Sequence, residues 1–243
     1  SGYVPLLARQ GFKGKVYCSE ATYELCRILL PDSGHLQEEE AEYANLNRFR
    51  KDMDRRNKKS GLPQRDIAPL YTVAQAQACL RQLRREEYDQ PFLPHPAVRV
   101  CLRDAGHILG SAIAEVWLEE GGATRKLVFS GDLGMPARPV LRDPQPIGSA
   151  DVLLVESTYG NRLHKSLEAT EDELVEAIER TLRRKRGNVV MPAFSVGRTQ
   201  EVIFVLADLV RRGRLKDLQV VVDSPMSMAA TEITLRHTSL LDG

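Results

Sequence analysis

The most informative stretch of the sequence lies in the second half of the chain, Val128-Phe129-Ser130-Gly131-Asp132-Leu133-Gly134. An apolar, β-branched run gives way here to glycine, with a carboxylate at the junction, which is typical of a strand that ends in a loop at a sheet edge. Two further stretches have the same form, residues 104–112 upstream and residues 152–160 downstream. The sequence therefore predicts three polar side chains at the ends of strands.

These side chains are His107, Asp132 and Glu156. Each has a plain alternative, because a histidine beside glycine is usually a satisfied loop residue and a Gly-Asp pair is usually a turn. Together, imidazole and carboxylate at successive strand ends suit a zinc-type site, since rigid strands hold N and O ligands in place.

Composition is that of an ordinary globular chain. The 243 residues suffice for one large domain or two modest ones, and 42% are hydrophobic while 28% are charged. No apolar run approaches the roughly 18 residues of a membrane span. The net charge of only +1 shows no overall excess of basic residues of the kind that indicates nucleic-acid binding. A nucleic-acid partner therefore has to be inferred from the site.

The four cysteines show no Cys-x-x-Cys pairing, and each lies in an apolar or helical context. This favours reduced core thiols over disulfides or zinc ligands, and a reducing cytoplasm as the location.

The first part of the chain reads as small α/β units. We predict a short helix ending at Gly11, a strand over 15–19 and a helix over 21–30 closed by Pro31. From about 32 to 70, acidic and then basic blocks with little apolar content indicate a charged surface insertion that is partly helical or mobile. Its basic half could contact RNA, but a solvated segment that pairs with its own acidic half is the favoured interpretation.

The middle of the chain reads as a sheet. Thr72 is expected to cap a helix through Glu87, and Gly121-Gly122 to turn a hairpin. A nearly continuous apolar run over 152–156 is typical of a strand buried on both faces. The other strands are predicted over 98–102, 112–118 and 126–130.

After Gly160, helices and strands alternate. A helix capped by Ser166 carries acidic residues in its first turns and basic residues before Gly187, an order that complements the helix dipole. A strand over 189–193, a helix over 199–212 and a strand over 219–222 then predict a βαβ unit with a parallel sheet.

Ligands collect at the carboxyl ends of parallel strands. Ser195 and Arg198 lie at such an end, so we predict that they hold a phosphate beside the helix N-terminus at Thr199. The alternative is that Arg198 only forms an ion pair with Glu201 or Asp223.

These motifs resemble a known family. Residues 106–112 and 130–134 and the run Glu-Ser-Thr-Tyr-Gly-Asn-Arg from Glu156 are similar to the metallo-β-lactamase superfamily, and more narrowly to its β-CASP branch of nucleic-acid nucleases. Residues 192–201 and 223–226 resemble that branch too, so the similarity covers most of the chain outside 31–70.

The resemblance implies an α/β fold: part of a four-layer αββα metallo-β-lactamase sandwich over 1–160, with the charged insertion at 32–70, and part of an inserted parallel-sheet β-CASP domain over 161–243. The main metal motif of the family, His-x-His-x-Asp-His, is absent, and its late histidine motifs would lie beyond Gly243. We therefore expect an internal fragment that is inactive as it stands.

The resemblance also implies the chemistry. Two zinc ions per full-length chain would activate a water that hydrolyses a phosphodiester of single-stranded RNA, in RNA processing or decay. His107 would be a ligand of one ion, Asp132 would bridge both, and Glu156 would share a proton with a later histidine. Independently of the resemblance, His164, Ser195 and Arg198 are predicted to contact the RNA from the second domain, and an exposed histidine at the approach to a helix is the equal alternative for His164. No membrane partner is expected, and a homodimer is left open.

Other functions stay in view at this point. An inactive scaffold subunit of an RNA-processing complex, a DNA nuclease and a thioesterase or lactamase would share parts of the pattern. The residues also leave open whether cleavage is endonucleolytic or exonucleolytic. No Gly-x-Ser-x-Gly or Gly-x-x-x-x-Gly-Lys motif supports a serine hydrolase or an NTPase.

Overall fold

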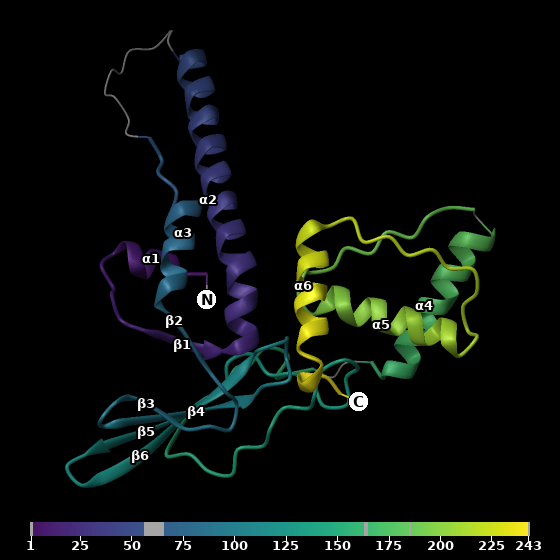
Figure 1. Ribbon diagram of the computed structural model, residues 1–243. Coiled ribbons are helices and arrows are strands. Elements are labelled where there is room, and N and C mark those ends of the chain that lie inside the picture. Colours follow the sequence, from purple (N-terminus) through teal and green to yellow (C-terminus); the bar gives the residue numbers. More distant parts are fainter. Residues whose placement is uncertain (1, 56–65, 163–164, 185, 243) are drawn as a thin grey trace. The chain divides into compact units, whose positions relative to one another are not determined.

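The computed structural model describes residues 2–55, 66–162, 165–184 and 186–242 (Figure 1). The chain forms two compact units, residues 1–86 and residues 87–243. Both combine helices and strands, which confirms the α/β class. The units are defined by packing alone, so the domain boundary expected at residues 160 and 161 stays a prediction. No helix in the described ranges is both long and apolar enough to cross a membrane.

The described part of the first unit contains a two-stranded parallel sheet and three helices. Its elements are α1 (Val4–Arg9), β1 (Val16–Ser19), α2 (Glu20–Arg55), α3 (Val73–Cys79), a 3-10 turn (Leu80–Gln82) and β2 (Leu83–Glu86). The predicted cap at Thr72 is confirmed, because its hydroxyl accepts the Gln75 N–H at 3.2 Å while the Gln75 side chain accepts the Thr72 N–H at 3.0 Å.

The helix predicted to stop at Pro31 does not stop there. Pro31 lies inside α2, which continues to Arg55 and takes in much of the charged segment from residue 32 (Figure 1). A proline removes one helical hydrogen bond and strains the preceding turn. Here Cys26 and Leu30, in the turn before it, are buried in the core of this unit, and that packing outweighs the local penalty.

The prediction of a helix from Thr72 to Glu87 is also wrong over the second half of this range. It ends at Cys79, and residues 83–86 form β2, which pairs in parallel with β1. Leu83 lies opposite Val16 and is 6% exposed. Tertiary pairing therefore overrides the helical pattern over these residues.

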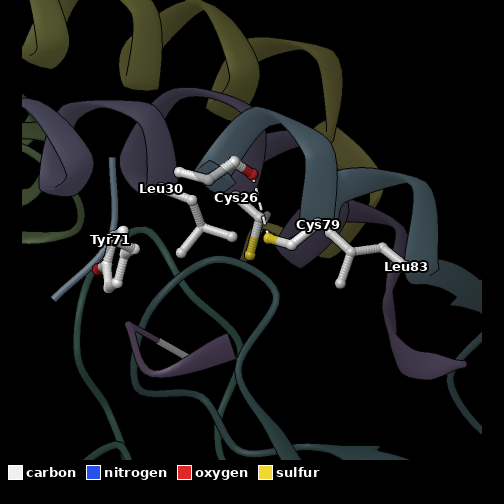
Figure 2. Packing of buried hydrophobic residues seen from close by; sticks show 6 residues of the cluster. Cys26, Leu30, Tyr71, Cys79 and Leu83 are labelled. Atoms are coloured by element: carbon white, nitrogen blue, oxygen red, sulfur yellow. Dashed lines mark hydrogen bonds between the residues drawn. The ribbon is translucent and has the colours of Figure 1, made fainter. Parts of the chain in front are cut away.

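A small core joins the elements of the first unit. Figure 2 shows Cys26 and Leu30 of α2 facing Cys79 of α3, with Tyr71 and Leu83 beside them. All four cysteines are free thiols, as predicted. Burial raises the pKa of Cys26 and Cys79, which keeps these sulfurs protonated and inert.

The second unit begins with a five-stranded mixed sheet, in the order β3-β4-β5-β6-β7. Gly121 and Gly122 have φ values of +59° and +80° and form the predicted hairpin turn between β5 and β6. The first three pairings are antiparallel, and β6 pairs with β7 in parallel. The strands are β3 (Phe92–His95), β4 (Val98–Asp104), β5 (Ala112–Glu120), β6 (Ala123–Phe129) and β7 (Val152–Leu154).

The strand β7 is not buried on both faces as expected. Val152 is 45%, Leu153 58% and Leu154 49% exposed. Successive side chains of a strand point to opposite faces, so the exposure of all three means that neither face is covered here. β7 is also the last strand of this sheet within the described ranges.

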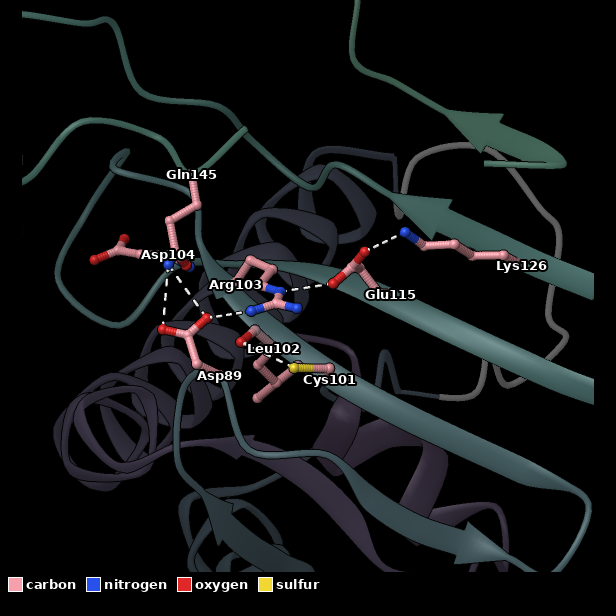
Figure 3. Close-up of polar contacts among 8 residues, drawn as sticks. All are labelled: Asp89, Cys101, Leu102, Arg103, Asp104, Glu115, Lys126 and Gln145. Carbon is pink, nitrogen blue, oxygen red and sulfur yellow. Dashed lines mark hydrogen bonds and ion pairs between the residues drawn. The ribbon is translucent and has the colours of Figure 1, made fainter. Parts of the chain in front are cut away.

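A buried carboxylate ties three strands together on one face of the sheet (Figure 3). Glu115 of β5 pairs with Arg103 of β4 at 2.6 Å and with Lys126 of β6, and Arg103 also pairs with Asp89 at 2.6 Å. Burial alone would raise the pKa of Glu115, but its hydrogen bonds to Lys126 and Arg103 prevail and lower it. The carboxylate therefore stays charged and fixes the strands that carry the site.

The rest of the second unit is mainly helical. Its elements are α4 (Leu167–Glu179), a π-helical turn (Arg180–Arg184), α5 (Arg198–Arg211), α6 (Pro225–Arg236) and a 3-10 turn (Thr238–Leu240). Ser166 caps α4 as predicted, with its hydroxyl accepting the Ala169 N–H at 3.2 Å. Ile178 of α4 packs against Leu206 and Leu209 of α5 in a second core.

The strands predicted over 189–193 and 219–222 do not form. The described residues of both segments have no strand pairing, and Val190 is 86% and Val221 75% exposed. A strand exists only where another backbone completes its ladder, and local apolar content cannot supply that partner. The parallel sheet expected here is therefore absent from the described structure.

Candidate functional site

The three sequence motifs end at the same edge of the five-stranded sheet. The strands β4 and β6 both run antiparallel to β5, and β7 runs parallel to β6. These three strands therefore point the same way, and the loops that follow them meet at one edge. His107, Asp132 and Glu156 lie in these loops, as the sequence predicts.

The loop that carries His107 is held by a single serine. The hydroxyl of Ser111 accepts the N–H groups of His107 at 3.1 Å and Ile108 at 3.3 Å. The carbonyl of Ser111 accepts the Tyr88 hydroxyl at 2.7 Å. The backbone under the imidazole is thus fixed, while the residue itself is exposed.

The loops of His107 and Asp132 pack backbone against backbone. The Gly134 N–H donates to the carbonyl of Ala105 at 2.8 Å. A Cβ at Gly134 would lie 1.8 Å from the carbonyl oxygen of Gly106, which no side chain tolerates. Glycine at position 134 therefore permits the close approach of the two loops that carry the candidate ligands.

Glu156 is fixed to the loop of Asp132. Its carboxylate accepts the N–H of Leu133, the residue next to Asp132. This hydrogen bond, with smaller contributions from the Thr158 side chain and from His107, lowers the pKa of Glu156. A lowered pKa keeps the Glu156 carboxylate ionised at neutral pH, in the form that accepts hydrogen bonds.

The donors fit zinc in kind but not in number. Imidazole nitrogen and carboxylate oxygen are ordinary zinc ligands, and a structural or catalytic site uses three or four protein donors. Within the ranges that the structure describes, no group of three or more histidine, cysteine, aspartate or glutamate side chains is placed to hold a metal. His107 and Asp132 therefore form at most part of a site.

The predicted phosphate contacts have mixed outcomes. Arg198 pairs with Glu201 at 2.7 Å, the alternative that the sequence left open, although its side chain remains 57% exposed. The first two N–H groups of α5, from Arg198 and Thr199, already donate to backbone carbonyls. A phosphate held near Ser195 would therefore depend on side chains. His164 lies outside the described residues.

The loop of Ser195 nonetheless lies beside the His107 loop. A Cβ at Gly197 would be 3.0 Å from the Ile108 side chain, and Arg138, in the chain after the Asp132 motif, lies 3.7 Å from Glu201. The positive φ of Gly197, +82°, forms the turn into α5. Segments of the second unit that are far apart in the sequence therefore lie side by side near the edge that carries the candidate ligands.

Sequence reasoning did not single out the residues that organise these loops. Gln200 is 8% exposed; its side chain accepts the Gly197 N–H at 2.8 Å and donates to the Ser195 carbonyl at 3.2 Å and the Thr231 hydroxyl at 2.8 Å. It therefore joins the Ser195 loop to α6. The only signal in the sequence was its place inside a recognised motif, since a glutamine alone predicts nothing of this kind.

The sequence of the chain is similar to those of several known proteins. The chain is 32% identical to Ribonuclease TTHA0252 of Thermus thermophilus over 226 residues, which is 93% of this chain and 44% of that protein. It is 29% identical to Transcription termination factor FttA of Methanothermobacter thermautotrophicus, over 92% of this chain and 31% of that protein. It is 33% identical to the RNase J-like protein of Methanocaldococcus jannaschii, over 57% of this chain and 32% of that protein.

No family model matches the chain. The chain spans less than half the length of each of these three relatives. The first two of these relatives nevertheless match more than nine tenths of this chain. These relatives support the family that the strand-end motifs resemble, the β-CASP branch of the metallo-β-lactamase superfamily.

Proposed function

We propose that the complete protein is a zinc-dependent ribonuclease that hydrolyses phosphodiester bonds of single-stranded RNA, in RNA processing or decay. One observation carries the proposal: the loops of His107, Asp132 and Glu156 converge at one sheet edge, with Glu156 bonded to the residue beside Asp132. Relatives named as a ribonuclease and as an RNase J-like protein support the RNA substrate.

In this proposal His107 would be a ligand of one of two zinc ions and Asp132 would be a ligand of both, because a carboxylate offers two anionic oxygens. Bound zinc would supply the activation of a water and the charge that stabilises the transition state. The remaining ligands would come from residues other than those grouped here. Free cysteines throughout the described part favour a reducing cytoplasm, and a homodimer stays a prediction.

Glu156 would orient, and exchange a proton with, a histidine that protonates the leaving oxygen. Its lowered pKa fits this role, since it is charged before the reaction starts. Its bond to Leu133 holds the carboxylate at a fixed place beside Asp132.

Ser195 and Arg198, together with His164, would contact RNA phosphates. The support is that the Ser195 loop lies against the His107 loop and that the Arg198 side chain is more than half exposed. A phosphate would compete with Glu201 for the guanidinium group.

Arg198→Ala is expected to weaken binding of single-stranded RNA and to flatten its salt dependence. Loss of one phosphate contact on a single strand lowers the slope of log K against log salt by about 0.7. The measurement is fluorescence anisotropy of labelled RNA at several salt concentrations, on the complete protein.

Arg183→Ala is the matched control, since Arg183 of the π-helical turn also pairs with a glutamate, Glu179, at 3.6 Å and is similarly exposed. It should leave the slope unchanged. An Arg198 variant with an intact slope and reduced thermal stability would instead show that the ion pair with Glu201 is its whole role.

The function itself is tested by incubating the complete protein with labelled single-stranded RNA, single-stranded DNA and a chromogenic lactam. We expect RNA cleavage that a chelator abolishes and zinc restores. The 243-residue chain alone should be inactive even with zinc, because His107 and Asp132 cannot close a tetrahedral site. Lactam turnover without RNA cleavage would contradict the assignment, and an inert complete protein would favour a scaffold.

A further inference from the structure

Ser130 lies at the end of β6, between the loops that carry Asp132 and Glu156. It is 4% exposed, although a serine at a strand end is normally in contact with water. Its hydroxyl donates to the Gly131 carbonyl at 2.6 Å and accepts the Glu156 N–H at 3.1 Å. Its own N–H donates to the Leu154 carbonyl at 2.9 Å, continuing the pairing of β6 with β7.

Each bond of the hydroxyl fixes the backbone at a candidate residue. Gly131 directly precedes Asp132 and has a φ of +56°, so the carbonyl that Ser130 binds belongs to the turn that aims Asp132. The other bond holds the main chain of Glu156 itself. The Ser130 hydroxyl therefore connects the two loops, and the bond from the Leu133 N–H to the Glu156 carboxylate connects them a second time.

We propose that Ser130 is a positioning residue that fixes Asp132 relative to Glu156. The inference rests on the proposed function. A metal ligand and a carboxylate that shares a proton each have to be held to within about 0.5 Å of the position that the reaction needs, and residues that hydrogen-bond to them or to their backbone provide that. The pairing of β6 with β7 ends at this point, so Ser130 is where strand hydrogen bonding gives way to side-chain bonding.

A purely structural role makes a different prediction. If the buried hydroxyl only satisfied local hydrogen bonds, its removal would lower the thermal stability of the protein and leave kcat unchanged. Ser19 is the matched control for that effect. It is 3% exposed, accepts the Thr22 N–H at 3.2 Å and bonds the Thr22 hydroxyl at 3.0 Å, and it belongs to the other compact unit.

The experiment compares Ser130→Ala, Ser130→Thr and Ser19→Ala in the complete protein. Turnover of single-stranded RNA is measured as kcat and KM, zinc content by elemental analysis, and amide hydrogen exchange at Glu156 in the metal-free protein. Ser130→Ala should lower kcat about 10-fold with KM nearly unchanged, the usual scale for loss of a group that orients a catalytic one. It should also speed exchange of the Glu156 amide. Ser130→Thr keeps the hydroxyl and should restore both.

Ser19→Ala should match the loss of thermal stability while leaving kcat and the Glu156 amide unchanged. A wild-type protein that cleaves RNA and a Ser130→Ala variant with the same kcat would overturn the inference and leave the proposed function standing. A wild-type protein without RNA cleavage would overturn the proposed function. In that case the exchange rate of the Glu156 amide still tests the positioning role of Ser130. Equal protection of this amide in Ser130→Ala and in wild type would exclude that role.

Discussion

Asp132→Ala is expected to leave the complete protein with fewer zinc ions per chain than His107→Ala. A bridging carboxylate serves both ions, so its removal weakens both, whereas loss of one imidazole weakens one. Elemental analysis of the purified proteins should find about two zinc ions per chain in wild type. RNA cleavage should be abolished in the Asp132 variant.

The Asp132 side chain can be removed without loss of the bonds that hold its loop. The Asp132 loop is held by backbone bonds, from Gly134 to Ala105 and from Leu133 to Glu156, and these do not use the Asp132 side chain. The loop should therefore keep its course when the carboxylate is removed. Asp66→Ala, at an exposed aspartate of the other compact unit, is the control and should keep both ions. Full zinc occupancy in Asp132→Ala would exclude the bridging role.

Glu156→Gln is expected to reduce turnover on the order of 10²-fold or more, the scale for a lost acid–base partner, with zinc content unchanged. The amide oxygen of glutamine can still accept the Leu133 N–H, so the substitution removes the charge and keeps the geometry. The measurement combines single-turnover RNA cleavage with elemental analysis of the same sample.

Glu120→Gln, at an exposed glutamate at the end of β5, is the matched control and should cleave as wild type does. Zinc that is lost in step with activity would make Glu156 a ligand. Wild-type activity in Glu156→Gln would remove it from the chemistry altogether.

Local signals were read correctly where the cause is local. Thr72 and Ser166 cap helices because a side-chain oxygen three residues from a free N–H satisfies it. Gly121-Gly122 makes a tight hairpin because both residues adopt positive φ. The course of β4, β5 and β6 follows from β-branched runs that glycine ends.

Predictions failed where the cause lies elsewhere in the chain. Pro31 does not end α2, because the turn before it is buried against α3. Residues 83–86 form a strand and not a helix because they pair with the backbone of β1. Residues 189–193 and 219–222 look like strands but have no described partner strand, and a strand cannot be stable without one.

For the site, the order of residues along the chain specifies the chemical types: an imidazole, then two carboxylates, each just after a strand. Their loops meet only in the folded chain, because three strands that run in the same direction bring their ends to one edge of the sheet. The supporting bonds of Ser130, Ser111 and Gln200 likewise appear only in the folded chain. A hydrogen bond between loops depends on angstrom-scale distances that residue spacing does not encode, whereas caps and turns depend on neighbours that it does.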